Sequence, residues 1–461
     1  MRYIAAVFKT AQHRFTIASL DEDGAGVGAP AGLAGRRLHV PFCLPGEEVV
    51  AEVEHQSPHR PEAWGRLVER HSSAPGRVPP ACPAWGRCGG CALQHLDYPQ
   101  QLLFKRRLVE DALALSGVSA EVGPCAAPGP PRPYRNRSKL VFGSEGGRVI
   151  LGAYAPRSHR LVDLRGCRVV IPPLDEVAAA LARLATDLGV VPYDERTAGG
   201  QARYAILRAA RDGRTQVLLV CAGRGGDALP RLATALMRER PEVVGVSENL
   251  QPSRGNALIG RVEEDRVLAG DPLLVERCGA TLRLSPRAFF QASWHGAEAL
   301  YAAAVAAAAP AAGDAIVDVY TGVGGIALSL AAAAPAARVL GIEEEPAAIG
   351  DAQAAAALGG LDNAAFSCGD AAALLAERAA RAERTDVVVV DPPRRGLAPA
   401  VVEAIAGLRP RRVVYVSCAP DTLGRDLALL AARGYAIDRV DPIDLMPDTP
   451  HVEAIATLTR R

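Results

Sequence analysis

Residues 317–325 read VDVYTGVGG, and this stretch decides the fold of the C-terminal part of the chain. A short apolar run passes into a glycine-rich turn, and a helical pattern follows it. Glycine lets the backbone approach a ligand closely where a strand gives way to a helix. The stretch therefore predicts a strand, a ligand-binding turn and a helix of a doubly wound α/β domain.

Four short apolar runs carry this pattern from about residue 286 to the C-terminus. They are residues 316–319, 339–342, 386–390 and 413–416, and alanine-rich helical stretches separate them. Continuous apolar runs of this length are typical of parallel strands that are buried on both faces. We therefore expect a Rossmann-like domain over residues 286–461.

Acidic residues follow these runs at the edge where a doubly wound sheet binds its ligand. Glu343 ends the second run, and Asp370 and Asp391 stand at the ends of the next strands. A carboxylate at Glu343 can accept hydrogen bonds from ribose hydroxyls. The turn lacks the G-x-G-x-x-G spacing of nicotinamide-cofactor sites. A nicotinamide cofactor is thus the weaker alternative, and a tight turn without a ligand is the other.

The composition is that of a globular protein with several domains. The chain has 461 residues, of which 49% are hydrophobic and 22% charged, and its formal net charge is +1. This charge does not argue for nucleic acid, although local basic patches remain compatible with it. The apolar stretches are too short to span a bilayer, so we expect a cytoplasmic protein. Its ten cysteines are then reduced, metal-bound or catalytic.

The N-terminal and central parts show other patterns. Residues 14–70 contain short β-rich runs between glycine turns, which predict a small barrel, and a linker follows at residues 72–80. A helix is expected over residues 97–117, and it can pack on the last domain. Strand and helix signals mix over residues 134–285, as in an α+β domain. We expect three domains, at residues 1–72, 73–285 and 286–461.

Cys418 ends the last buried run and is the strongest candidate for a nucleophile. A lone cysteine is more often a small buried hydrophobe. Its place beside the predicted cofactor turn instead favours an activated thiolate. A thiolate that adds to a substrate also needs a general base nearby, and Glu453 could be that base, although a glutamate near a terminus is usually a solvated surface residue.

Three segments resemble the signature motifs of the RNA uracil-5-methyltransferase family: DPPRRG at 391–396, SCAP at 417–420 and HVE at 451–453. The resemblance implies a class I methyltransferase domain that uses S-adenosyl-L-methionine, with Cys418 as the nucleophile and Glu453 as the base. It also implies that the cofactor is contacted by Gln291, Tyr320, Gly325, Glu343, Asp370 and Asp391.

Two positions depart from the family's usual pattern. Gly325 stands where the family commonly has Asn. Glycine has no side chain, so a side-chain contact to the cofactor is not expected from this position. Ala419 stands where Asn often follows the nucleophile, so one polar group beside Cys418 is missing.

The cysteines outside this domain suggest a metal site. Cys82, Cys88 and Cys91 lie in one short glycine-rich segment, and Cys167 follows later. Four thiolates suit zinc or an iron–sulfur cluster, and spacing alone does not decide between these and unrelated reduced cysteines. The set resembles the iron–sulfur branch of the family, which implies a [4Fe-4S] cluster with a structural or RNA-contacting role. We expect the remaining cysteines to be packing residues: Cys43, Cys125, Cys221, Cys278 and Cys368.

The N-terminal barrel resembles the TRAM RNA-binding module, an OB-like fold, most clearly in LPGE at 44–47. The densest basic segments are residues 134–139 and 157–160, which could contact RNA or form a solvated face. The whole chain thus predicts an OB-like β-barrel, an α+β iron–sulfur middle domain and a Rossmann-like class I methyltransferase domain.

The expected function is methylation of carbon 5 of a uridine in a structured RNA. Barrel and cysteines together resemble the ribosomal branch of the family, so 23S rRNA is favoured over tRNA. We expect a monomer without a membrane partner. The alternatives are a cytosine or purine substrate on the same fold, and a non-catalytic RNA-binding protein.

Overall fold

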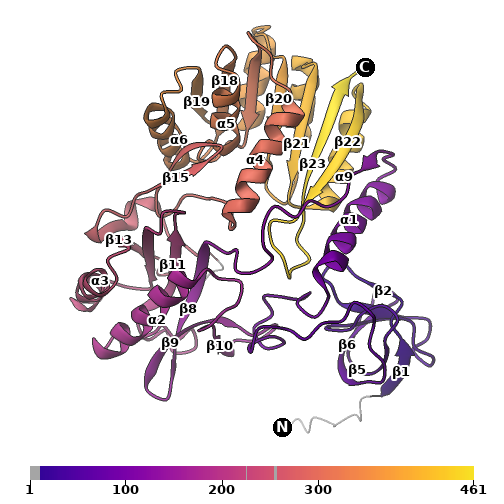
Figure 1. The fold of residues 1–461 in the computed structure, drawn as a ribbon, viewed down its shortest axis with the longest axis vertical. Coiled ribbons are helices and arrows are strands. Elements are labelled where there is room, and N and C mark those ends of the chain that lie inside the picture. The colour runs from indigo at the N-terminus through magenta and orange to yellow at the C-terminus, as the bar shows by residue number, and fades with distance from the viewer. Residues whose placement is uncertain (1–10, 225, 254–256) are drawn as a thin grey trace. The chain divides into compact units, whose positions relative to one another are not determined.

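The computed structural model describes residues 11–224, 226–253 and 257–461, which form two compact units (Figure 1). The first unit extends to Phe104 and also contains Pro447–Pro450. The second unit comprises Lys105–Met446 and His451–Arg461. The predicted domain boundaries near residues 72 and 285 stay a prediction.

The first unit is built on a six-stranded sheet with the order β1-β5-β6-β4-β3-β2. Ile17 N donates to Glu47 O at 2.9 Å, and Ala18 N donates to Val27 O at 2.8 Å. The segment between β1 and β2 therefore bonds to both ends of the sheet, and the predicted small barrel is confirmed. Its strands are β1 (Gln12–Thr16), β2 (Ser19–Leu20), β3 (Gly26–Gly28), β4 (Arg37–Val40), β5 (Glu48–Gln56) and β6 (Glu62–Arg70).

Helix α1 (Tyr98–Leu115) contributes residues to both units. In the first unit, Gln101 Nε2 donates to Asp448 Oδ1 at 3.2 Å, and Asp448 N donates to Gln101 Oε1 at 2.8 Å. In the second unit, Lys105 Nζ lies 2.5 Å from Asp444 Oδ1, and both side chains are fully buried. Because buried polar groups require partners, each bond fixes its part of the C-terminal segment to this helix.

The second unit contains two large sheets, of which the first has seven strands in the order β10-β9-β8-β11-β12-β13-β14. Neighbouring strands are antiparallel except β12 and β13. Helices α2 (Pro172–Asp187) and α3 (Ala228–Glu239) bury their apolar sides on one face, which confirms the α+β prediction (Figure 1). The strands are β8 (Arg137–Glu145), β9 (Arg148–Tyr154), β10 (Leu161–Asp163), β11 (Ala202–Ala209), β12 (Thr215–Cys221), β13 (Val243–Leu250) and β14 (Asp265–Gly270), with a 3-10 turn at Val262–Glu264.

The second large sheet has the order β19-β18-β17-β20-β21-β23-β22-β7. Strands β19 to β21 are parallel, and β23 runs antiparallel between β21 and β22. This is the predicted Rossmann-like domain. The strands are β7 (Glu121–Val122), β17 (Ala315–Val319), β18 (Arg338–Glu343), β19 (Ala364–Cys368), β20 (Val387–Val390), β21 (Arg412–Ser417), β22 (Tyr435–Ile443) and β23 (Glu453–Arg460), and a hairpin of β15 (Leu274–Cys278) and β16 (Ala280–Leu284) precedes them.

Six helices accompany this sheet, and their alanine-rich sides form its core with the valine-rich strands. Small side chains allow helices and strands to pack closely, which suits a sheet covered on both faces. The helices are α4 (Trp294–Ala308), α5 (Gly325–Ala333), α6 (Pro346–Gly359), α7 (Ala371–Ala380), α8 (Pro399–Leu408) and α9 (Pro420–Ala431).

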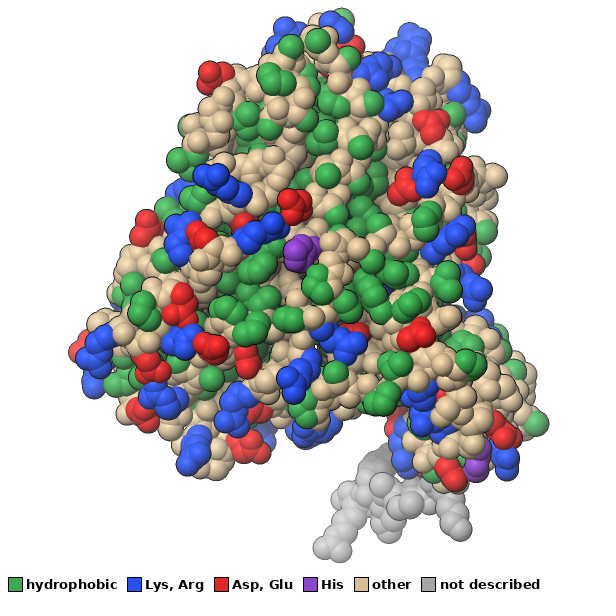
Figure 2. Space-filling view, viewed as in Figure 1, with side chains coloured by type: hydrophobic (Ala, Val, Ile, Leu, Met, Phe, Trp, Pro, Cys, Tyr) green, Lys and Arg blue, Asp and Glu red, His purple; other side chains and the backbone are tan. Residues whose placement is uncertain are grey.

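The structure also shows how the charged side chains are distributed on the surface and which of the cysteines are buried. Figure 2 shows Lys and Arg side chains mixed with Asp and Glu across the visible face. In the described part of the chain, no helix combines the length and apolar character that crossing a bilayer requires. Cys43, Cys125, Cys221 and Cys278 are buried, as expected of packing residues. The same prediction for Cys368 is wrong, because it is exposed at the end of the edge strand β19.

Candidate active site

The turn after β17 is organised by the carboxylate of Asp318, which is almost fully buried. Its Oδ2 accepts hydrogen bonds from Thr321 Oγ1 at 2.6 Å and from Ala327 N at 3.0 Å. Its Oδ1 is buried and has no hydrogen-bond partner among the described residues. The side chain therefore ties β17 to the first turn of α5 and keeps one acceptor atom available.

Tyr320 and Glu343 shape the side of this turn that faces β18 and β19. Tyr320 has φ of 65°, a left-handed conformation that is unusual for a tyrosine. Glu343 accepts hydrogen bonds from Gly322 N at 3.1 Å and from Glu344 N at 2.9 Å. Glu343, the predicted acceptor for ribose hydroxyls, therefore already accepts hydrogen bonds from the turn. Each of its carboxylate oxygens can accept a further hydrogen bond, so it can still bind a ribose.

A cavity of about 210 Å³ opens beside this turn. Tyr320 and Asp370 line it, together with the segment that follows Asp391. Asp370 also caps α7, because its carboxylate accepts from Ala373 N at 2.9 Å. Two predicted cofactor residues therefore lie in one cavity at the carboxyl ends of parallel strands. The full lining is Tyr320, Glu344, Gly369, Asp370, Ala371, Ala372, Arg395, Gly396, Leu397, Ala398 and Val401.

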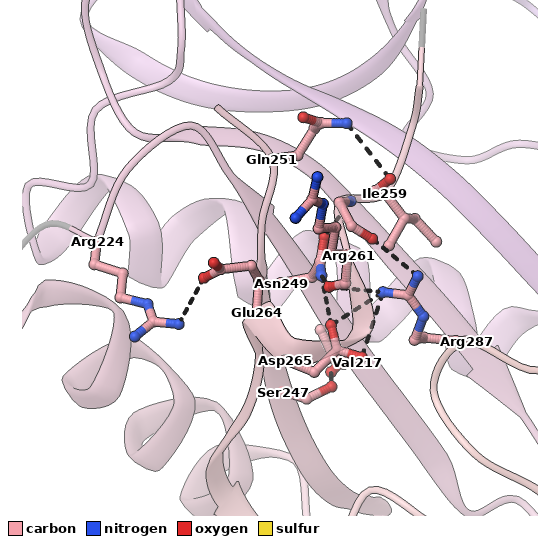
Figure 3. Close-up of polar contacts among 11 residues, drawn as sticks. Val217, Arg224, Ser247, Asn249, Gln251, Ile259, Arg261, Glu264, Asp265 and Arg287 are labelled. Carbon is pink, nitrogen blue, oxygen red and sulfur yellow. Dashed lines mark hydrogen bonds and ion pairs between the residues drawn. The ribbon is translucent and has the colours of Figure 1, made fainter. Parts of the chain in front are cut away.

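Gln291 lies at the end of a segment that is anchored to the seven-stranded sheet. Arg208, buried on β11, donates to Ser285 O at 3.2 Å and to Ala288 O. Arg287 Nη2 donates to Gly260 O at 2.9 Å, and Figure 3 shows its guanidinium turned toward the Asp265 carboxylate. The segment before Gln291 is therefore held in place by contacts on two sides, while Gln291 itself is half-buried.

Asp391, Cys418 and Glu453 come together at the carboxyl edge of the eight-stranded sheet. In the antiparallel pair β21–β23, Ser417 is opposite Ala454, and one further step in this register places Cys418 opposite Glu453. Asp391 follows the neighbouring strand β20, and its N–H donates to Val319 O at 3.2 Å. The two candidate catalytic residues are thus cross-strand neighbours, next to the strand that carries the cofactor turn.

Burial raises the pKa of each of these groups. The pKa of Glu453 rises to about 8, because its carboxyl is buried and Asp391 adds to the effect. Burial, with Asp318 nearby, also raises the pKa of Asp391 to about 7. The pKa of Cys418 rises to about 11 through burial, Glu453 and Asp391, whereas Arg394 lowers it. The pKa of Cys418 is thus raised and not lowered, so the activated thiolate stays a prediction, which requires a change in the surroundings of this thiol.

Asp426 on α9 is a residue of this site that the sequence analysis missed. Its Oδ2 accepts from Leu397 N at 2.7 Å and from Tyr415 Oη at 2.7 Å. A Cβ added at Gly396, where φ is 74°, would lie 2.4 Å from the same oxygen. Asp426 is fully buried and so clamps the segment after Asp391 onto β21, the strand that leads to Cys418. Its partners are distant in sequence, so no local motif reveals this role.

The predicted metal ligands are distributed over both units. Cys82, Cys88 and Cys91 are half-buried in the first unit, where Cys82 N donates to Gln94 Oε1 at 2.7 Å. Cys167 belongs to the second unit and follows β10. Among the residues that the structure describes, no group of three or more His, Cys, Asp or Glu side chains could hold a metal ion.

Comparisons with known proteins give a consistent result. A family model described as tRNA (Uracil-5-)-methyltransferase matches residues 257–461. An uncharacterized RNA methyltransferase from Halalkalibacterium halodurans is 36% identical over 450 residues, which cover 96% of each chain. Another from Gloeobacter violaceus is 38% identical over 431 residues, 92% of each chain. The crystal structure of Pyrococcus abyssi tRNA (uracil-54, C5)-methyltransferase in complex with S-adenosyl-L-homocysteine aligns with a TM-score of 0.76 and 26% identity, covering 97% of this chain and 100% of that one.

The Asp426 clamp can be tested by removing its carboxylate. Asp426→Ala leaves the buried Leu397 N–H and Tyr415 hydroxyl without an acceptor, which should lower the free energy of unfolding by about 2–4 kcal/mol. Tyr415→Phe, which removes one donor, should cost about 1 kcal/mol. Urea unfolding measures both, with Asp362→Ala at an exposed position as the control. Hydrogen exchange at Leu397 N–H should also become faster in Asp426→Ala, and unchanged exchange there would contradict the clamp.

Proposed function

The chain belongs to the RNA uracil-5-methyltransferase family, and we propose that Cys418 and Glu453 carry out its reaction on a uridine of 23S ribosomal RNA. It is an S-adenosyl-L-methionine-dependent methyltransferase that acts on carbon 5 of uridine in RNA. The observation that carries the assignment of these two residues is their cross-strand register at the end of β21 and β23, beside Asp391.

The residues at the β17–α5 turn fit the methyl donor. Asp318 Oδ1 is a buried acceptor that has no partner in the described part of the chain, and a cavity of about 210 Å³ lined by Tyr320 and Asp370 can take a nucleoside. When bound, S-adenosyl-L-methionine supplies an electrophilic methyl group attached to a positively charged sulfur. We assign its binding to six residues: Gln291, Tyr320, Gly325, Glu343, Asp370 and Asp391.

Cys418 and Glu453 have complementary tasks in the proposed reaction. Cys418 releases its proton to solvent and its sulfur forms a bond to carbon 6. The carbon 5–carbon 6 double bond opens in this step, so that carbon 5 becomes an enolate carbon and accepts the methyl group. Glu453, as a carboxylate, then takes the proton from carbon 5, and the sulfur–carbon 6 bond breaks to release Cys418. The target uridine must leave its stack to reach these side chains. The exposed Arg394 lowers the pKa of both groups and thus favours their charged forms.

Trapping the covalent intermediate separates the two tasks. Cys418→Ala should form no adduct and no product, because no sulfur is available to add to carbon 6. Glu453→Gln should accumulate an adduct with ordinary RNA on denaturing gels, because carbon 5 keeps its proton. Cys368→Ala, which removes an exposed cysteine, should behave like the wild type. RNA carrying 5-fluorouridine should trap the wild type, and methyl transfer to it without any adduct would overturn this assignment.

The pH dependence follows from the raised pKa of Glu453. A base with a pKa of about 8 is mostly protonated at pH 7, so release of the methylated product should become faster as pH rises through about 8. Single-turnover release measured from pH 6 to 9 tests this, and a pH-independent release step would argue against Glu453 as the base.

The choice of RNA depends on the resemblance of the barrel and the cysteine segment to the ribosomal branch. Transfer RNA is the second candidate, because the aligned Pyrococcus abyssi structure is that of a tRNA (uracil-54, C5)-methyltransferase. Mapping 5-methyluridine in total RNA from a deletion strain distinguishes them. Loss of one site in 23S rRNA is the expected result, and loss in tRNA would favour the alternative. We propose that the barrel acts as a TRAM-type RNA-binding module and that the enzyme works as a cytoplasmic monomer.

We also propose that Cys82, Cys88, Cys91 and Cys167 bind a [4Fe-4S] cluster. The support is the donor chemistry and the glycine-rich spacing, and no step of methyl transfer depends on it. Full-length protein purified without oxygen should then contain about four iron atoms and four sulfides per chain. Cys82→Ser should lose them and Cys368→Ser should keep them. Stoichiometric zinc without iron would overturn the cluster.

A further inference from the structure

Gly325, the first residue of α5, has the side chain of Tyr301 in the space that a Cβ would take. Its φ lies outside the left-handed range, so its conformation is open to other residues. A Cβ at this position would, however, lie 2.4 Å from both Oη and Cζ of Tyr301. The phenol of Tyr301, which comes from α4, therefore occupies the volume that a side chain at position 325 would need.

The hydroxyl of Tyr301 is unusual for a tyrosine inside a protein core. Only 6% of the residue is exposed. Its hydroxyl makes no hydrogen bond with another described residue, and it is not among the fully enclosed polar atoms, so it keeps some accessible surface. By contrast, the buried hydroxyl of Tyr415 donates to Asp426 and that of Tyr435 donates to Pro410 O. The ring of Tyr301 is therefore held in the core, while its hydroxyl remains open to a partner from outside the protein.

The charges around this hydroxyl indicate what it could bind. Burial raises the pKa of Tyr301 well above its usual value, and Cys278, Asp391 and Asp318 add to the effect. The carboxylate of Asp318 accepts from Ala327 N, in the same turn of α5 as Gly325. Its other oxygen, Oδ1, is a buried polar atom that has no partner among the described residues. The start of α5 adds free backbone N–H groups, which favour an anionic group.

We propose that the hydroxyl of Tyr301 binds the amino-acid end of the methyl donor, at the place that a side chain at position 325 would otherwise occupy. A phenol can donate to the carboxylate or accept from the ammonium group of that end. The adenosine end would lie in the cavity beside Tyr320 and Asp370. This inference rests on the proposed cofactor site and adds a binding residue from α4 to it.

Ligands that differ only at the amino-acid end test this assignment. S-adenosyl-L-homocysteine has that end, and 5′-methylthioadenosine lacks it. Tyr301→Phe keeps the ring in place and removes only the hydroxyl. Calorimetry should show affinity for S-adenosyl-L-homocysteine lowered about 10-fold or more, with affinity for 5′-methylthioadenosine unchanged. Tyr435→Phe, another buried tyrosine of the same unit, should leave both affinities unchanged.

Stability without ligand gives a second measurement. Removal of a hydroxyl that has no partner should leave the Tm of Tyr301→Phe equal to that of the wild type or higher, whereas a purely structural role predicts a lower Tm. Unchanged affinity for S-adenosyl-L-homocysteine would overturn the inference, and so would an equal loss for both ligands. A wild type that binds neither ligand would instead show that the proposed cofactor site is wrong, and this inference would fail with it.

Discussion

The crowding of acidic groups at one edge of the eight-stranded sheet is the constraint on which the site depends. Asp318 raises the pKa of Asp391, and Asp391 raises the pKa of both Glu453 and Cys418. Arg394 is the cation that lowers the pKa of the last two. Asp318 and Glu453 are buried and Asp391 and Cys418 are half-buried, so these groups cannot all be charged without a compensating positive charge. The edge is therefore suited to a cationic ligand.

The methyl donor has the charge that this edge lacks. Its sulfur is positively charged before transfer and neutral afterwards, so the compensating charge disappears when the methyl group leaves. In the proposed reaction Glu453 accepts the carbon 5 proton at that stage, and its raised pKa of about 8 means that it binds a proton readily. The burial that opposes a free Cys418 thiolate thus also helps Glu453 to take up a proton. The same burial thus raises the pKa of both groups. It favours proton uptake by Glu453, and it means that Cys418 can lose its proton only when a nearby positive charge stabilises the thiolate.

Much of this arrangement could be predicted from the sequence, because strand ends and short motifs are local features. The buried runs predicted the parallel strands, and Asp391 and Cys418 were expected where these strands end. The pKa of Cys418 could not be predicted, because it depends on how deeply the strand ends are buried. Asp426 could not be found either, since its bonds to Leu397 and Tyr415 join residues that only the fold brings together.

The segment just before Glu453 is held by contacts that the motif at residues 451–453 does not include. Glu453 begins β23 in the second unit, but Asp448, a few residues earlier, belongs to the first unit. There Gln94 Nε2 donates to Asp448 Oδ2 at 3.3 Å, and Gln94 Oε1 accepts from Cys82 N. Within the first unit, hydrogen bonds through Gln94 therefore join the cysteine segment to Asp448. Asp448, which precedes β23 in the chain, is therefore held by buried hydrogen bonds to Gln94 and Gln101 and not by the eight-stranded sheet.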